Sequence, residues 1–161
     1  MTEEDIIAHV AALPGVVAYT PDETSEAPEI AWGDTFVFYD PDDAAGNRVM
    51  PFATIVTKDY PGFDTESRLD RPGVFRLNIA VGREAFTDLI GHSPADHARH
   101  HDRFDYAAAD QVLPHPAYAT QSWVCIVNPG PETEALTREL LSAAHTRAAL
   151  RYRPRNSTAP D

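Results

Sequence analysis

Strand-like segments follow one another directly through the first half of this chain, and their order limits the possible folds more than any other feature. Four segments rich in residues that favour strands are separated by polar stretches containing Pro, Gly and Asp: 16–19, 30–39, 52–58 and 74–81. Consecutive strands without an intervening helix pair antiparallel, because parallel neighbours need a long crossover connection. We therefore expect a mostly antiparallel sheet.

A helix is expected before the first strand. Residues 2–13 carry apolar side chains at helical spacing, and Pro14-Gly15 follows them as a stop signal. Thr2 is a suitable N-cap, and Asp5 stands three residues later, where a capping box usually has Glu. The chain therefore opens with a short amphipathic helix.

The second half of the chain mixes helices with one more strand. Residues 84–90 predict a short helix, and residues 131–151 predict the longest helix of the chain. Between them we expect a helical turn at 107–116 and a last strand at 122–127. The predicted class is α+β, with a mostly antiparallel sheet backed by N- and C-terminal helices.

The length of 161 residues fits one domain, which we expect to span residues 1–150. The remaining segment, 151–161, contains three arginines and is expected to be a disordered basic tail. No apolar run approaches the ~20 residues that a membrane helix needs. Because the first ten residues are acidic rather than basic, we expect a cytoplasmic protein without membrane contact.

Acidic side chains are concentrated near the N-terminus. Residues 1–50 carry 11 acidic side chains and a single basic one, Arg48, within a chain whose formal net charge is −12. Such a surface repels the phosphate backbone of nucleic acids. The charge therefore disfavours nucleic-acid binding.

Residues 74–81 alternate cleanly between apolar and other side chains. Phe75, Leu77, Ile79 and Val81 share one face, which we expect to be buried, while Arg76 and Asn78 point the opposite way. If 52–58 is the neighbouring strand, Thr54 and Lys58 join that opposite face. The interpretation is either an ordinary solvated patch or a ligand site on an uncovered face, where Arg76 with Lys58 would favour an anionic group.

Other candidate ligand-binding residues lie at strand ends and in loops. Trp32 and Asp34 open the second strand, and Asp34 can pair with a cation across the sheet. His115 stands between two prolines, close to Tyr118, in a loop that can hold an imidazole at the edge of a cleft as an acid, base or hydrogen-bond donor. The alternative is a structural turn. The long polar loop 59–73 adds four further polar groups: Asp59, Asp64, Ser67 and Asp70.

The sequence favours neither a metal nor a cofactor. His97, His100 and His101 have a spacing that a helical metal site can use, but Pro94 and many charges nearby favour a solvated loop. The lone Cys125, in an apolar strand, is expected to be a buried structural thiol and excludes an internal disulfide. No phosphate-binding, dinucleotide-binding or nucleophile-elbow motif occurs.

Four stretches together resemble an actinobacterial family filed as "domain of unknown function 6194": WGDTFVFYDPD, PFATIVTKDYPGFDTESRLDRPGVFRLNIAVGRE, LPHPAYATQSWVCIVNPG and ALTRELLSAAHTRA. That family is functionally uncharacterised, so the resemblance implies no activity. More distantly, RLNIAVGREAFTDLIG, SWVCIVNPG and the C-terminal helix are similar to MmcQ/YjbR-like domains. This similarity implies a small α+β domain with a double-wing, DNA-binding-like fold. Those domains typically carry Lys before the Trp-Val pair, whereas this chain has Ser122.

Three functions remain open from the sequence. The leading one is a domain that binds a small molecule or a protein partner at the sheet patch and adjoining loops, as a monomer or homodimer. The second is a metal-independent enzyme that acts on an anionic small molecule, with His115 as acid or base. The third is a DNA-binding-like module, which the charge disfavours.

Overall fold

The computed structural model describes residues 1–42 and 50–153, and it contains one six-stranded sheet in the order β1-β2-β3-β4-β6-β5. Every neighbouring pair of these strands is antiparallel. The strands are β1 (Val16–Tyr19), β2 (Thr35–Tyr39), β3 (Ala53–Val56), β4 (Arg76–Ala80), β5 (Leu113–Pro114) and β6 (Trp123–Val127). The expected α+β class and antiparallel sheet are confirmed.

Three α-helices accompany the sheet: α1 (Glu3–Ala11), α2 (Arg83–Ile90) and α3 (Glu134–Arg151). The capping box at the start of α1 is formed as predicted, with reciprocal hydrogen bonds between Thr2 and Asp5. Among the described residues, short 3₁₀ segments lie in the connections: η1 (Glu29–Ala31), η3 (Pro94–Arg99), η4 (His101–Arg103) and η5 (Ala119–Gln121).

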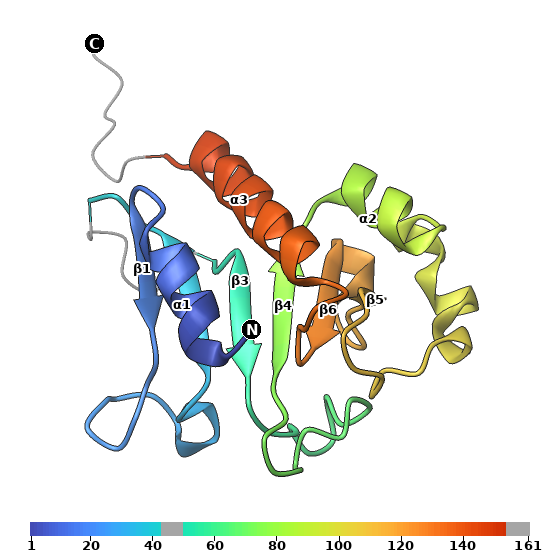
Figure 1. Cartoon of the computed structure of the whole chain (residues 1–161), viewed down its shortest axis with the longest axis horizontal. Coiled ribbons are helices and arrows are strands. Elements are labelled where there is room, and N and C mark those ends of the chain that lie inside the picture. The colour runs from blue at the N-terminus through green and yellow to red at the C-terminus, as the bar shows by residue number, and fades with distance from the viewer. Residues whose placement is uncertain (43–49, 154–161) are drawn as a thin grey trace.

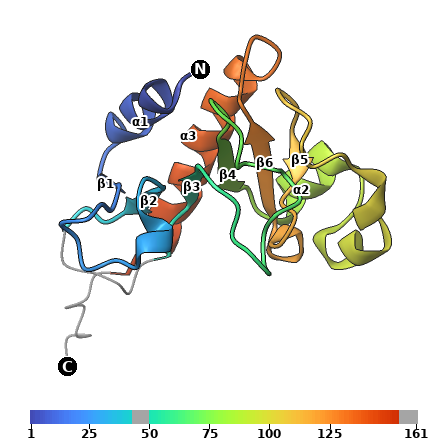
Figure 2. The ribbon, with the colours of Figure 1, turned by 90° about the horizontal axis from the view of Figure 1, so that it is seen from below.

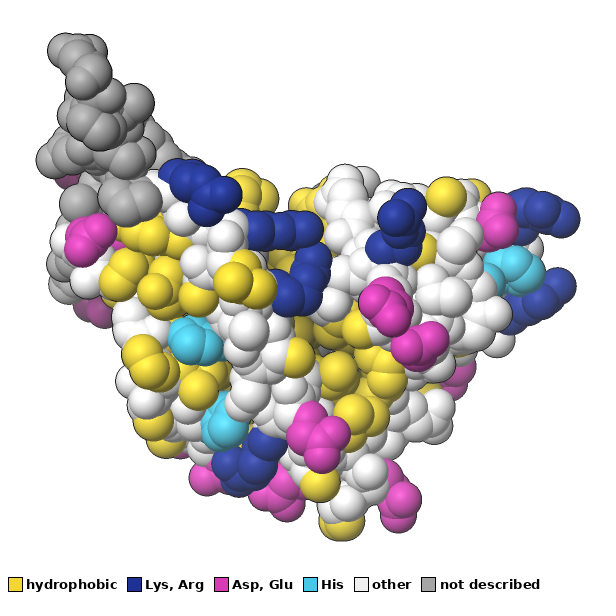
Figure 3. Space-filling view, turned by 90° about the horizontal axis from the view of Figure 1, so that it is seen from above, with side chains coloured by type: hydrophobic (Ala, Val, Ile, Leu, Met, Phe, Trp, Pro, Cys, Tyr) yellow, Lys and Arg dark blue, Asp and Glu magenta, His cyan; other side chains and the backbone are white. Residues whose placement is uncertain are grey.

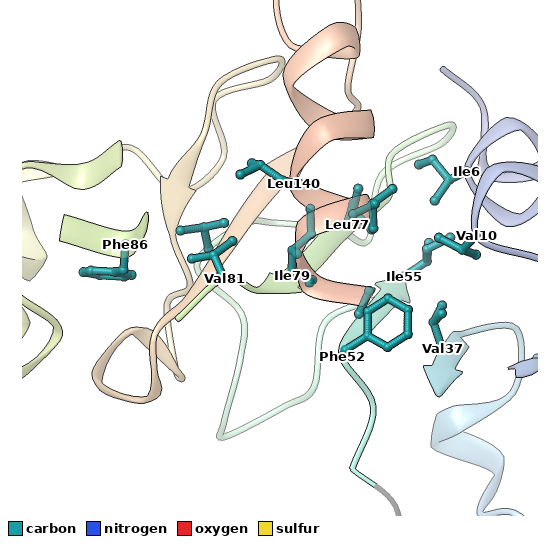
Figure 4. Close-up of a cluster of buried hydrophobic side chains, with 14 of the residues drawn as sticks. Ile6, Val10, Val37, Phe52, Ile55, Leu77, Ile79, Val81, Phe86 and Leu140 are labelled. Atoms are coloured by element: carbon teal, nitrogen blue, oxygen red, sulfur yellow. The ribbon is translucent and has the colours of Figure 1, made fainter. Parts of the chain in front are cut away.

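Helices α1 and α3 lie on one face of the sheet and form the hydrophobic core with it (Figure 1). Ile6 and Val10 of α1 point toward Ile55 and Val37, and Leu140 of α3 reaches the same layer (Figure 4). Burial of such side chains stabilises the fold by about 1.5–3 kcal/mol for each residue. This face of the sheet is therefore covered by α1 and α3.

The alternation in residues 74–81 is confirmed. Phe75, Leu77, Ile79 and Val81 all belong to the buried core cluster, and Leu77 and Ile79 are completely shielded from solvent. Arg76 and Asn78 therefore face away from the helices, because successive side chains of a strand point to opposite faces.

Two predicted segments differ from the structure. The strand expected from residue 30 begins only at Thr35, because η1 and Gly33, with a φ of +85°, turn the chain first. The helical turn expected at 107–116 is wrong: Ala109 forms an isolated bridge with Val127, and Leu113 and Pro114 form β5 against β6. Proline fits there because β5 is an edge strand, where fewer backbone N–H groups are needed.

The C-terminal end of the described residues lies close to β2. Arg151 is the last residue of α3, and the ring of Tyr152 packs edge-on against Tyr39 at 5.3 Å between centroids. Residues 154–161 of the predicted tail lie outside the described residues, as does Arg48 within residues 43–49. Within the part that is described, no helix has the length and apolar character needed to span a bilayer.

Candidate functional site

Two loops cover the sheet face opposite α1 and α3. One runs from β3 to β4 and the other from β5 to β6, and both lie on the side of the sheet away from these helices (Figure 2). They meet where the rings of Phe63 and Tyr118 approach to 5.6 Å between centroids. The expectation of an uncovered face is therefore wrong, since Arg76 and Asn78 are 0% and 2% exposed beneath these loops.

A pocket of about 290 Å³ lies between the loops and the sheet. An engineered apolar cavity of roughly 150 Å³ holds benzene, so this pocket has room for a larger small molecule. Most of its lining is apolar or aromatic: Phe36, Met50, Pro51, Val56, Tyr60, Phe63, Tyr118 and Trp123. The remaining lining side chains are polar: Thr54, Asp64, Asn78, His115 and Gln121.

Arg76 lies under this pocket and organises the polar lining. Its Nη1 donates to Asp64 Oδ1 at 3.0 Å and to Ser67 Oγ at 2.8 Å, and its Nη2 donates to Asp64 Oδ2 at 2.6 Å. Its Nε donates to Asn78 Oδ1 at 2.7 Å, and Nη2 also lies 3.3 Å from Nε2 of His115. The guanidinium thus connects β4 to both covering loops.

Asp64 compensates the buried charge of Arg76. Burial raises the pKa of the Asp64 carboxyl, but the hydrogen bonds and charge of Arg76 outweigh that effect and hold the pKa below its ordinary value. Asn78 extends the network because its Nδ2 donates to Thr54 Oγ1 at 2.9 Å. These polar groups are satisfied without exposure, as buried polar groups must be.

The imidazole of His115 is neutral and held in one orientation. Its Nδ1 accepts hydrogen bonds from the backbone N–H groups of Ala117 and Tyr118, both at 3.0 Å. Burial, aided by the positive charge of Arg76, lowers its pKa to about 3. This geometry favours a hydrogen-bond donor at neutral pH over the predicted acid or base, because Nδ1 is already used and Nε2 must carry the proton.

Lys58, Asp34 and Trp32 form a second cluster beside the pocket. Lys58 Nζ donates to Asp34 Oδ1 at 3.1 Å and to the backbone oxygen of Trp32 at 2.7 Å. Thr57 also donates to Asp34 through its backbone N–H and its hydroxyl. Tyr60, which lines the pocket, donates a short hydrogen bond to Asp34, and burial together with this bond raises the pKa of its phenol.

The seven predicted ligand-binding residues lie either at the pocket or in this second cluster. Asn78, His115 and Tyr118 line the pocket, and Arg76 contacts two of them from below. Lys58, Asp34 and Trp32 reach the pocket only through Tyr60.

The expected preference for an anion does not follow from this arrangement. Arg76 is paired with Asp64, and Lys58 is paired with Asp34. The expectation required two uncompensated cations on one face of the sheet. The structure corrects it, since each cation already has a carboxylate partner.

Several pocket residues escaped the sequence prediction. Tyr60 and Phe63 flank Pro61-Gly62 in a loop that otherwise reads as polar. In the structure, Phe63 contacts Tyr118 on the other covering loop, with 5.6 Å between ring centroids. Phe36 was visible only as a strand residue, because its face depends on the register of β2 with β3.

The histidines of segment 92–105 are packed rather than solvated, although the charged side chains between them are exposed, and this corrects the expected solvated loop. His97 is 4% exposed and stacks against His92, with 3.0 Å between its Nδ1 and His92 Nε2. His101 lies 3.3 Å from His97 Nε2 and pairs with Glu66 at 2.8 Å. Among the described residues, no group of three or more His, Cys, Asp or Glu side chains is placed to hold a metal ion.

Cys125 is fully buried in β6, as predicted. Burial raises the pKa of its thiol to about 12, so the thiolate form needed for nucleophilic attack is strongly disfavoured at neutral pH.

Comparisons with known proteins identify a family and no closer relative. No curated protein and no solved structure matches the chain. One family model, described as a family of unknown function (DUF6194), matches residues 1–157. Because this match spans nearly the whole sequence, the chain belongs to the DUF6194 family.

Proposed function

We propose that this protein is a small-molecule-binding domain whose ligand occupies the pocket between the sheet and its two covering loops. The observation that carries the proposal is an aromatic-lined pocket of about 290 Å³ built over a buried, fully charged Arg76–Asp64 pair. Ligand sites are typically concave and mostly apolar, with a few fixed polar groups. Burying an ion pair is costly, and its position under a pocket supports a role in holding the pocket's polar lining.

Exposed aromatic side chains at the rim support the same function. Phe63 and Tyr118 are 58% and 38% exposed, although each packs against the other. Tyr118 also lies 4.9 Å from the ring of His115, measured between centroids. A row of rings leading from solvent to a buried imidazole suits a partly aromatic ligand.

The other functions proposed from the sequence have weaker support. An enzyme with His115 as acid or base has weaker support because its Nδ1 already accepts two backbone N–H groups, its Nε2 carries the proton, and its pKa is lowered to about 3. For a nucleic-acid partner, Figure 3 shows several Lys and Arg side chains gathered in a row on one part of that face, with acidic side chains beside them, but the net charge of −12 is unfavourable. We retain a cytoplasmic location and a distant relation to MmcQ/YjbR-like domains as proposals, supported by the sequence patterns alone.

A fragment screen tests the proposed function. Uncharged fluorinated aromatic fragments are screened by ¹⁹F NMR, and hits are located by amide and indole shifts. We expect hits that shift the Trp123 indole and the Tyr118 amide, since both residues line the pocket.

A variant whose side chain fills the pocket provides the matched comparison. Val56→Phe places a ring in the pocket and should abolish these shifts, whereas Leu150→Phe, at a 74% exposed position on α3, should preserve them. The proposal fails if no fragment shifts pocket residues, or if Val56→Phe binds the hits as well as the unmodified protein does.

A further inference from the structure

A groove separate from the pocket lies between the start of α2 and the second half of α3. Its volume is about 950 Å³, and it shares no lining residue with the pocket. In Figure 3, which views this end of the molecule, Lys and Arg side chains form a row with acidic ones beside them. We call this hollow the arginine groove, because Arg83, Arg147 and Arg151 line it.

The three arginines of this groove form no ion pair with the residues that the structure describes. The ion pairs present there involve other cations. Two acidic side chains, Glu84 and Asp88, also line the groove, and both belong to α2. The wall formed by α3 carries Arg147 and Arg151 and no acidic side chain. An anion in the groove is therefore attracted to the α3 wall.

Arg147 lies where the local electrostatics disfavour a cation. Its Nη1 donates to the backbone oxygen of Ala80 at 3.3 Å, and its guanidinium packs against Gly82, the N-cap of α2. A Cβ at residue 82 would lie 2.5 Å from Cζ of Arg147, so glycine is needed for this contact. The N-terminal end of a helix carries a partial positive charge. Burial and the charge of Arg151 also lower the pKa of Arg147, which shows that its charged form is destabilised.

Helix polarity accounts for only one of the three arginines. The C-terminal end of a helix favours cations, and Arg151 is in the last turn of α3. Arg83 is the first residue of α2, and Arg147 packs against the N-cap of the same helix, so both are at the end that favours anions. Negative charge bound between the two helices would compensate both of these cations.

We propose that the arginine groove binds a small phosphorylated molecule, a phosphate ester or a diphosphate, with Arg147 and Arg151 as its main contacts. This site is independent of the proposed function, because it lies outside the pocket. A guanidinium presents a planar fork of N–H donors that matches two oxygens of a phosphoryl group at once. The groove volume of about 950 Å³ leaves room for the organic part of an ester, since ligand sites typically measure roughly 300–1,000 Å³.

Calorimetric titration with pyrophosphate at constant ionic strength tests the site. Arg147→Gln should weaken binding by about tenfold or more, the effect expected when one hydrogen bond to a charged group is lost. Arg138→Gln removes an arginine of the same helix that pairs with Glu134 outside the groove, and it should leave the affinity unchanged. An equal loss in the two variants would overturn the proposal, because the net charge of the protein would then control binding.

Two further comparisons test the phosphoryl class. Arg147→Lys keeps the charge but removes the planar fork, so it should also weaken pyrophosphate binding. Citrate, a tricarboxylate, should bind the unmodified protein more weakly than pyrophosphate does. Full affinity in Arg147→Lys, or citrate binding as tight as that of pyrophosphate, would overturn this ligand class. Melting temperatures establish that the variants are folded, and Arg151→Gln, at an exposed position, repeats the test if Arg147→Gln is unstable.

Amide shifts in ¹H–¹⁵N spectra locate the bound pyrophosphate. It should shift the amides of residues 82–85 and leave the Trp123 indole unchanged, since Trp123 lines the pocket and not the groove. Shifts at the pocket without shifts at residues 82–85 would overturn the proposal. A short single-stranded oligonucleotide should bind more weakly than pyrophosphate, because the net charge of −12 repels a longer phosphate backbone. Tighter binding of the oligonucleotide would overturn the small-molecule class.

Discussion

At the scale of the residue, we expect the ion pair between Asp64 and Arg76 to have a large effect on the free energy of unfolding. Arg76 is completely buried, and Asp64 binds it through both carboxylate oxygens. Asp64→Asn keeps the shape but leaves the guanidinium charge uncompensated, so we expect a loss of about 3–5 kcal/mol in the free energy of unfolding. Urea denaturation at pH 7 measures this loss.

The control for this prediction is another acidic residue. Asp88 is exposed on α2, and Asp88→Asn should change the stability by less than about 0.5 kcal/mol. If Asp64→Asn is equally mild, the ion pair does not hold the covering loop in solution.

At the scale of the element, the two faces of strand β4 have different roles. One of its faces belongs to the hydrophobic core, where Leu77 is 0% exposed, and the other holds the polar network. Leu77→Ala removes buried methyl groups and leaves a cavity, so the free energy of unfolding should fall by about 2–5 kcal/mol. Chemical denaturation of the variant beside Leu150→Ala, at an exposed position of α3, provides the comparison. A loss below about 1 kcal/mol for Leu77→Ala would contradict the packing described.

Elements with local signals were predicted well, and those without them were not. The α1 capping box and the alternation of β4 both depend on residues close together in sequence. By contrast, β5 is defined only by the pairing of Leu113 and Pro114 with β6, the next strand along the chain. A two-residue edge strand has no periodicity for a sequence to display.

Acidification should destabilise the whole molecule through its buried histidines. Burial lowers the pKa of His97 to about 4, with help from neighbouring imidazoles, and that of His115 to about 3. An unfolded histidine has a pKa near 6.5. Below about pH 6.5 the unfolded chain binds protons at these histidines and the folded chain does not. Their contribution to the free energy of unfolding is therefore fully retained only above that pH. As the pH falls from there toward about 4, it should be lost at up to roughly 1.4 kcal/mol per pH unit for each histidine.

Urea denaturation at pH 7, 6 and 5 measures this dependence. His97→Phe removes one of the two groups and should reduce the slope by about one proton between pH 6 and pH 5. A free energy of unfolding that stays constant from pH 7 to pH 5 would show that neither imidazole is neutral and buried in solution.

The sequence by itself determined the α+β class, the antiparallel sheet and the faces that Leu77 and Arg76 take, since strand alternation and capping act over a few residues. It also singled out Asn78, His115 and Tyr118, which line one pocket. Only the tertiary structure decided that Arg76 is buried, that Asp64 is its partner, and that Lys58 belongs to a separate cluster with Asp34. The physical reason is that burial and charge pairing depend on how two loops, distant in sequence, fold over the sheet, and no local pattern encodes that contact.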